Sequence, residues 1–265
     1  IGLGAALFVL QAVLSPRLGC LEPTRALLAA GGLFLALAAA FFARAGAQLR
    51  AFTRANAEAS AAVYRGELER ACALFEQNAR RFRSPSLHPI CVHNLADTLL
   101  QRGELERALA LAAAVAGYRG LLMSPLVAAS APSLVASCYA LLGDLESARA
   151  WLPRARQAAA SIACENAVVP EVLLACREGR PLDALQRMEE RRRQIDATLA
   201  GTDQRVLRLM RAFALEGLPE QPEEERQIAR ALARPSFEGE YDFLAGRWPQ
   251  LASYLRSAGW AAKQG

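Results

Sequence analysis

The side chains with the widest chemical scope are two histidines, His88 and His93, the only histidines in the sequence. Their separation of five residues places them on different faces of a helix, and His88 lies between two prolines in the run SPSLHP. Cys91 stands two residues before His93, a spacing that directs a thiol and an imidazole apart on a helix. We therefore predict neither a metal pair nor a Cys–His nucleophile at these positions.

No familiar catalytic or nucleotide-binding motif occurs: the sequence contains no GxGxxG, GxxxxGK[ST], GxSxG or HExxH. Its six cysteines form no CxxC pair and mostly fall among apolar positions, which indicates reduced thiols inside a core. Free thiols are more typical of the cytosol than of an oxidising compartment. We predict a protein that is not an enzyme and that holds neither a metal nor a cofactor.

The composition indicates a helical body joined to a membrane segment. Of the 265 residues, 53% are hydrophobic and 22% are charged, which excludes a disordered chain and a wholly polytopic membrane protein. Arginine supplies all but one of the 31 basic residues, the exception being Lys263, and the net charge is only +5. The run EERRR at residues 189–193 is interpreted as a solvated helix face, the alternative being a contact with an acidic partner or a membrane surface. We expect no nucleic-acid partner, and the abundance of arginine and alanine suggests a bacterial protein.

Two apolar runs near the beginning predict a transmembrane helical hairpin. Residues 1–14 rise about 21 Å as a helix, which is short of the hydrocarbon core, so we interpret them as the rear of a span or as a signal-type segment. Residues 27–43 carry no charge and are bounded by Arg25 and Arg44, which predicts a second span over residues 27–45. The link between the runs contains turn-forming Pro16 and Pro23. The lipid bilayer is thus one predicted partner, through residues 1–14 and 27–43.

The distribution of arginines predicts the orientation of the chain in the membrane. Arg44, Arg50 and Arg54 follow the second run before the first acidic residue, against two arginines in the link. Because basic residues favour the cytoplasmic side, this small excess places the C-terminal body in the cytoplasm. The expected location is therefore the bacterial inner (cytoplasmic) membrane.

After residue 50 the sequence alternates apolar and charged residues at helical spacing, and one turn recurs four times. The copies are RGELERA from Arg65, RGELERA from Arg102, LGDLESA from Leu142 and EGRPLDA from Glu178. Their glycines are 37, 40 and 36 residues apart. Each glycine is predicted to end one helix in a left-handed conformation, and the alanine five residues later to pack closely within the helix pair. The glycines and alanines are Gly66, Gly103, Gly143, Gly179, Ala71, Ala108, Ala148 and Ala184.

These turns resemble the tetratricopeptide repeat (TPR), a helix-turn-helix unit of about 34 residues. The family's small and bulky positions fall on apolar residues here: Ala96, Ala136, Phe75, Leu152 and Met188, with the aromatic position at Tyr139. The resemblance implies an all-α fold in which residues 48–235 form a right-handed superhelix of helix pairs, a TPR-like solenoid. A fifth, degenerate unit is expected near Gly217, and residues 236–265 are expected to form capping helices.

The resemblance also implies a curved groove lined by the first helix of each pair, which would bind a protein or peptide partner. Asn94 matches a position at which some family members hold a C-terminal carboxylate, but no basic residue occupies the matching clamp positions, so carboxylate capture is not expected. The groove-facing positions are Asn56, Ser60, Tyr64, His93, Asn94, Asp97, Ser130, Ser133, Ser137, Asn166, Val169 and Arg177.

Three hypotheses about function follow. The first is a membrane-tethered adaptor or scaffold that binds its partner in the groove. The alternative is the C-terminal regulatory region of a larger polytopic membrane enzyme, such as an intramembrane protease, whose catalytic helices precede residue 1. The third is a soluble repeat protein in which the apolar runs pack as a helix pair.

Overall fold

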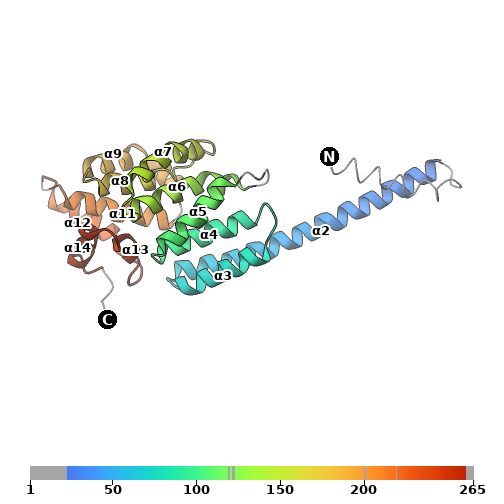
Figure 1. Cartoon of the computed structure of the whole chain (residues 1–265), viewed down its shortest axis with the longest axis horizontal. Coiled ribbons are helices and arrows are strands. Elements are labelled where there is room, and N and C mark those ends of the chain that lie inside the picture. The colour runs from blue at the N-terminus through green and yellow to red at the C-terminus, as the bar shows by residue number, and fades with distance from the viewer. Residues whose placement is uncertain (1–22, 119, 121–122, 200, 219, 261–265) are drawn as a thin grey trace. The chain divides into compact units, whose positions relative to one another are not determined.

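The computed structural model describes residues 23–118, 120, 123–199, 201–218 and 220–260, with side chains from residue 31 onward. These residues form α-helices joined by turns, and no strand occurs among them (Figure 1). The all-α prediction is confirmed for this part of the chain. The predicted first span at residues 1–14 lies outside the described residues, so the helical hairpin stays a prediction.

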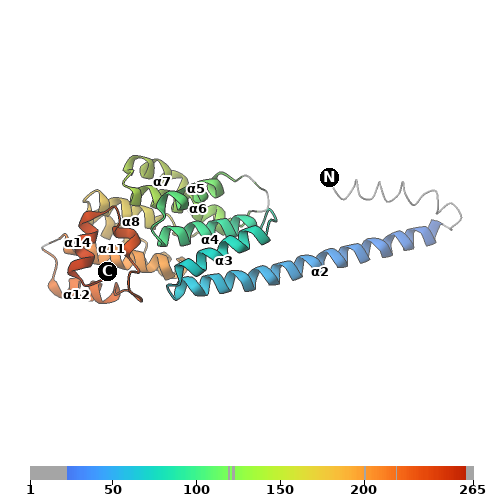
Figure 2. The same cartoon turned by 60° about the horizontal axis from the view of Figure 1, so that its bottom comes forward.

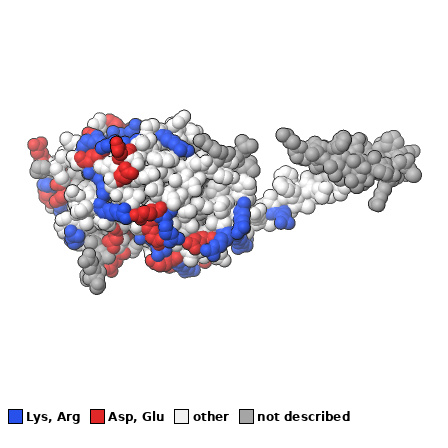
Figure 3. All heavy atoms as spheres, in the orientation of Figure 1, with Lys and Arg blue, Asp and Glu red and all other residues white. Residues whose placement is uncertain are grey.

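The chain divides into two units, residues 1–53 and 54–265, and helix α2 (Pro23–Tyr64) contributes to both. The predicted span at residues 27–45 lies within this 42-residue helix, which continues unbroken through the expected junction at residues 45–48. In the first unit α2 exposes large apolar side chains, including Leu35, Phe41 and Phe42. Figure 3 shows mixed acidic and basic side chains on one face of the second unit, so that face carries no single-sign patch.

Two described helices are long and apolar enough to cross a membrane, and burial distinguishes them. One lies in α2, where the apolar stretch is not buried at all. The other is α6 (Pro125–Leu142), of which 67% of the apolar stretch is buried within the second unit. Helix α6 packs against α4, α5, α7 and α8, so it has the surroundings of a core helix. Only the segment in α2 presents an apolar surface without protein covering it.

The second unit consists mainly of helix pairs, and most of its helices pack on a neighbour along the chain (Figures 1 and 2). Helix α4 pairs with α5, α6 with α7, α8 with α9 and α11 with α12, while α11 also packs on α8 and α9. The end of α2 lies beside α3 in both views, and Glu58 of α2 forms an ion pair with Arg70 of α3 at 3.5 Å. The bounds are α3 Leu68–Arg81, α4 His88–Gln101, α5 Leu105–Gly117, α7 Leu145–Ala160, α8 Val168–Arg177, α9 Pro181–Glu190, α10 Arg192–Thr198, α11 Gly201–Glu216, α12 Glu223–Leu232, α13 Asp242–Ala245 and α14 Pro249–Ser257.

The four repeated turns share one backbone geometry. Their glycines have φ between +70° and +88°, as predicted. In each turn the glycine N–H donates to the carbonyl three residues earlier, and the next residue's N–H donates to the carbonyl five residues before it. At the first turn these bonds are Gly66 to Val63, 2.9 Å, and Glu67 to Ala62, 2.9 Å. This double closure satisfies carbonyls at the helix end and fixes the direction in which the next helix starts.

The predicted fifth turn, at Gly217, has a different geometry. Its N–H donates to the Phe213 carbonyl at 3.4 Å, four residues back, and it is absent from the glycines of positive φ. Pro222 follows and stands at the N-terminal cap of α12. Gly259, at the end of α14, instead repeats the double closure with φ +72°. Leu218, which follows Gly217, donates to the Leu215 carbonyl at 3.1 Å and not to the carbonyl five residues back, so the double closure is absent between α11 and α12.

The packing positions predicted from the repeat register are buried, except that Tyr139 at the aromatic position is only partly buried. The four alanines that follow the turns are at most 1% exposed, and Ala96 and Ala136 are fully buried. The bulky positions are buried as well: Phe75, Leu152 and Met188 are 2%, 9% and 7% exposed. Small side chains at the pair contacts let the helix backbones approach closely, and large ones fill the space beside them. The described cysteines are all buried and free.

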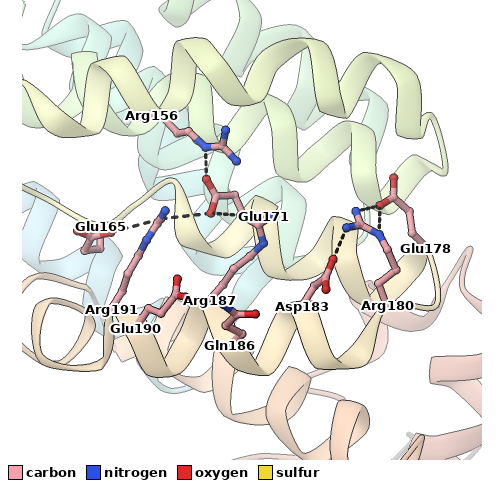
Figure 4. A network of polar contacts seen from close by, with 10 residues as sticks. All are labelled: Arg156, Glu165, Glu171, Glu178, Arg180, Asp183, Gln186, Arg187, Glu190 and Arg191. Carbon is pink, nitrogen blue, oxygen red and sulfur yellow. Dashed lines mark hydrogen bonds and ion pairs between the residues drawn. The ribbon is translucent and has the colours of Figure 1, made fainter.

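A buried carboxylate links three consecutive helices (Figure 4). Glu171 on α8 has a fully buried side chain and forms ion pairs with Arg156 of α7, Arg187 of α9 and Arg191, which follows α9. Arg187 and Arg191 each approach one Glu171 oxygen at 3.2 Å, and Arg191 also lies 3.6 Å from Glu165. The EERRR run is thus not wholly solvated: Arg191 is recruited to this centre, while its neighbours are exposed.

The C-terminal segment reaches back to the beginning of the second unit. Trp248 and Tyr254 pack edge-on against Phe213 of α11, with ring centroids 5.4 and 5.6 Å apart, which is a contact expected of a capping segment. The same segment also places Phe237 against the Gly66 turn and pairs Arg247 with Glu106 of α5. Residues 237–248 therefore connect the last helices to the first two repeat turns, a long-range contact that the sequence did not predict.

Replacement of Gly66 by alanine is expected to destabilise the second unit more than the same change at Gly179. Both positions have positive φ, which costs an L-residue about 1–2 kcal/mol. At Gly66 the new Cβ would also lie 2.9 Å from the Phe237 ring, whereas at Gly179 it would meet nothing within 4 Å. Thermal unfolding of the detergent-solubilised chain measures the difference. Gly117→Ala, at an open position of ordinary φ, is the control, and equal melting of Gly66→Ala and this control would contradict the turn geometry.

Glu171→Gln is expected to lower the free energy of unfolding by about 1–3 kcal/mol, because it removes the buried anion but leaves three arginines that water can reach. Glu165→Gln is the matched control: its single pair at 3.6 Å is worth less than about 1 kcal/mol. Chemical or thermal unfolding followed by circular dichroism compares the two variants. An equal effect of both would show that Glu171 does not hold the three helices together.

Candidate functional site

A polar hollow of about 510 Å³ lies between the end of α2, helix α4, the start of α6 and the segment joining α10 to α11. Its lining includes residues from four separate parts of the second unit. Eight of the predicted groove residues are among them, so the structure brings most of that set together. They are Asn56, Ser60, Tyr64, His93, Asn94, Asp97, Ser130 and Asn166.

Helical spacing explains how α2 and α4 present these side chains. Asn56, Ser60 and Tyr64 are four residues apart and share one face of α2. His93 and Asp97 repeat the same spacing on α4. The two faces are joined directly, since Asn94 Nδ2 donates to Asn56 Oδ1 at 2.8 Å. This amide bridge sets the register between the first and second helix pairs and leaves the remaining polar groups facing the hollow.

His93 is a neutral side chain in this wall. Its Nε2 lies 3.0 Å from Ser130 Oγ, which also lies 2.9 Å from the Leu126 carbonyl. Nδ1 is buried and has no partner. Burial lowers the pKa of His93 to about 4, so the ring is uncharged at neutral pH.

Two carboxyl groups face the hollow from opposite parts of the unit. Asp97 on α4 accepts a bond of 2.9 Å from Gln101 Nε2, and burial raises its pKa to about 6 despite that bond. Asp203, in the first turn of α11, has its pKa raised to about 7, first by burial and then by the negative charge of Asp97. A raised pKa means that the ionised form is disfavoured for lack of compensating charge. At neutral pH the hollow therefore contains uncompensated negative charge.

Asp203 is the site residue that sequence reasoning missed. Asp203 lies in the first turn of an amphipathic helix, where an acidic side chain interacts favourably with the helix dipole. The residue therefore has a structural explanation that requires no binding role. The resemblance supplied groove positions for four units only, and α11 belongs to the fifth. If the groove positions of the repeat had been extended to α11, they could have identified Asp203 and the neighbouring Thr202.

The lining contains no arginine and no lysine among its described residues. Tyr64, His93, Asp97 and Asp203 are the titratable side chains of the lining. Because two of them are carboxyl groups, the described lining favours a positively charged group over an anion.

Four predicted groove positions lie elsewhere. Ser133 and Ser137 are only 5% and 7% exposed because α6 is covered on several sides, and Val169 of α8 is 7% exposed. The Arg177 guanidinium lies 5.2 Å from the Trp248 ring centroid and donates to the Arg247 carbonyl. Burial lowers the pKa of Arg177. The C-terminal segment thus occupies the place where the register expected Arg177 to meet a partner.

Other chemistry is not assembled in the described part of the chain. No group of three His, Cys, Asp or Glu side chains there is arranged to hold a metal ion. Cys91 is fully buried, and burial raises the pKa of its thiol to about 11, so the nucleophilic thiolate is disfavoured. His88 lies apart from His93, with Nδ1 3.0 Å from the Ala79 carbonyl. The arrangement around the hollow is suited to binding.

Comparisons with protein-family models, curated proteins and solved structures found no match to this chain. What the hollow does is therefore argued from its own geometry and charge.

Asp203→Asn is expected to stabilise the protein at pH 8 by about 1–3 kcal/mol, since each pKa unit corresponds to about 1.4 kcal/mol. The folded-state pKa of Asp203 is raised, so its contribution is fully favourable below about pH 4 and is lost as pH rises through about 7. The gain of the variant should therefore shrink toward pH 4. The pKa of His93 is lowered and not raised, but His93 is present in both the variant and the wild type, so it does not affect the comparison.

Melting temperatures at pH 4.5, 6 and 8 test this expectation against Asp196→Asn, which alters an exposed aspartate on α10. The control should follow the wild type at every pH. The stability difference between Asp203→Asn and wild type could instead stay constant from acid to alkaline pH. That result would show that the pKa of Asp203 is not raised in the folded protein.

Proposed function

We propose that this chain is a membrane-tethered adaptor, without enzymatic activity, that binds an extended segment of a protein partner in the polar hollow. The observation that supports the proposal is the convergence of residues from α2, α4, α6 and the segment before α8 on one hollow. Most of these residues had been predicted as groove positions from the resemblance to the TPR family. Some of them are more than a hundred residues apart in the sequence, and their local spacing alone does not require them to meet.

The arrangement of the helix pairs supports a TPR-like, right-handed solenoid as the scaffold. Four pairs are joined by turns with the same hydrogen bonds, and consecutive pairs pack on one another. A regular rotation between stacked pairs produces a concave face lined by the first helices. In this proposal α2, α4, α6, α8 and α11 are those first helices, and the hollow is the part of the concave face nearest the beginning of the second unit.

The size and chemistry of the hollow suit a few residues of an extended peptide. Its volume of about 510 Å³ falls within the range of small-molecule pockets, roughly 300–1,000 Å³. Amide and hydroxyl side chains such as Asn56, Ser60 and Asn166 line it and can replace the hydrogen bonds that a peptide backbone makes with water. Val63, Phe75 and Ile90 add apolar surface to the same lining.

The apolar stretch of α2 supports attachment to a membrane. Residues 27–43 are uncharged and their helix would rise about 25 Å, close to the thickness of the hydrocarbon core. Arg44, Arg50 and Arg54 follow, which favours a cytoplasmic second unit at a bacterial inner membrane. The helix that contains this stretch also carries Asn56, Ser60 and Tyr64. Tethering raises the effective concentration of a membrane-associated partner and allows a weak groove contact to suffice.

Site-specific photocrosslinking in washed membranes tests this function. A photoreactive phenylalanine at Ser60, which lines the hollow, is expected to yield discrete adducts with another polypeptide. The same residue at Glu146, exposed on α7 and outside the hollow, is the control and is expected to yield none. Adding His93→Ala and Asp97→Ala should reduce the Ser60 adducts at least severalfold without abolishing folding. Adducts that form equally at both positions, or that survive the double substitution unchanged, would contradict the proposed groove. Release of the chain by high salt alone would contradict the membrane attachment.

A further inference from the structure

The charged groups that line the hollow are acceptors of hydrogen bonds. Asp97 and Asp203 offer carboxylate oxygens there, beside neutral amide and hydroxyl groups. A partly buried carboxylate costs free energy unless a ligand or water supplies a donor. The missing partner of this wall is therefore a hydrogen-bond donor.

No basic side chain among the described lining residues balances these acceptors. The charged and titratable groups that face the hollow are Tyr64 from α2, His93 and Asp97 from α4, and Asp203 from α11, while the described lining residues of α6 contribute only Ser130 and neighbours without charge. The Cys138 thiol lies near enough to sense the charge of Asp97, and burial keeps it protonated. His93 cannot supply the charge because its ring stays neutral. A cationic ligand would supply the charge that the described lining lacks.

The spacing of the acceptors favours an organic cation. His93 and Asp97 lie one helical turn apart on the same face of α4, and Asp203 approaches from another helix. The three groups do not form a metal-binding group, and the hollow has room for several atoms beyond the charge. A primary ammonium group carries three N–H donors and can satisfy both carboxylates and a neighbouring hydroxyl or amide oxygen at once.

We infer that the hollow recognises a primary ammonium group, presented by a lysine side chain or by the free amino terminus of the bound segment. This inference rests on the proposed function and specifies the chemistry of the partner. The ammonium group would donate to the carboxylates of Asp97 and Asp203. Binding would bring the carboxylates into charge balance, so it would be accompanied by release of protons near pH 6.5.

Fluorescence anisotropy with the detergent-solubilised full chain tests the inference at pH 7.5. Four labelled octapeptides share a neutral polar sequence: one with blocked termini and a central lysine, one with glutamine in place of that lysine, one with acetyl-lysine there, and one with glutamine and a free amino terminus. The lysine peptide, the free-amine peptide or both should bind about tenfold more tightly than the glutamine and acetyl-lysine peptides, since loss of a charge-assisted contact of this kind costs about 1.4 kcal/mol or more. The tighter of the two shows which source of the ammonium is preferred.

Substitution of the carboxylates locates the effect. Asp203→Asn should remove the preference for the amine while leaving the protein folded, and Asp196→Asn, on the exposed face of α10, should leave it intact. The preference should also weaken on acidification from pH 7.5 to 5, as Asp203 and Asp97 become protonated. A preference that is unaffected by Asp203→Asn would overturn the inference.

A second probe separates this inference from the proposed function. n-Butylammonium is added while the side-chain carboxyl signal of Asp203 is followed by carbon NMR in the full chain. Peptides that bind equally with or without an amine would overturn ammonium recognition and leave peptide binding in place. Absence of peptide binding together with an n-butylammonium-induced shift of Asp203 would overturn the peptide-binding function and support ammonium recognition. Absence of both effects would overturn both proposals.

Discussion

The second unit depends on a backbone constraint repeated four times: a helix that must end in a left-handed residue. Gly66, Gly103, Gly143 and Gly179 adopt positive φ, and each turn closes with the same pair of hydrogen bonds. Because a Cβ is unfavourable there, glycine fixes where the first helix stops and in which direction the second begins. The buried alanine five residues later allows the two helices to pack closely. Successive first helices are thereby brought into similar orientations, and the side chains of the hollow depend on that alignment.

Local turns do not by themselves hold the pairs to one another, and long-range interactions supply this connection. Glu171 joins α7, α8 and the end of α9 through three arginines, so that the buried anion is compensated from several directions. The C-terminal segment adds contacts between the last helices and the first turns, through Phe237 at Gly66 and Arg247 at Glu106. A chain of stacked pairs contacts mainly its nearest neighbours, so these distant contacts restrict motions that nearest-neighbour packing would allow. They stabilise the packing of the helices on which a preformed hollow depends.

The lining of the hollow differs in chemistry from the surrounding apolar core. Around it, alanine, leucine and valine are buried in a continuous apolar cluster. Within it, two carboxyl groups with raised pKa values and an imidazole with a lowered pKa are kept close together without balancing charge. Such an arrangement costs stability in the free protein, and a cost of this kind is common where binding groups are held ready for a ligand. The amide bridge between Asn56 and Asn94 shows that polar groups here are satisfied where no ligand is needed.

Much of the local structure was predictable from the sequence. Helical periodicity predicted an all-α chain after residue 50, and the recurrence of glycine predicted the four turns and the buried alanines beside them. Spacing of four residues was enough to group Asn56, Ser60 and Tyr64, because side chains on one helix face are related by local geometry. The meeting of Asp97 with Asp203, the burial of Ser133 and Ser137, and the contact of Arg177 with the C-terminal segment were decided only by the tertiary structure. Each depends on how helices distant in the sequence pack against one another, which the spacing of neighbouring residues does not determine.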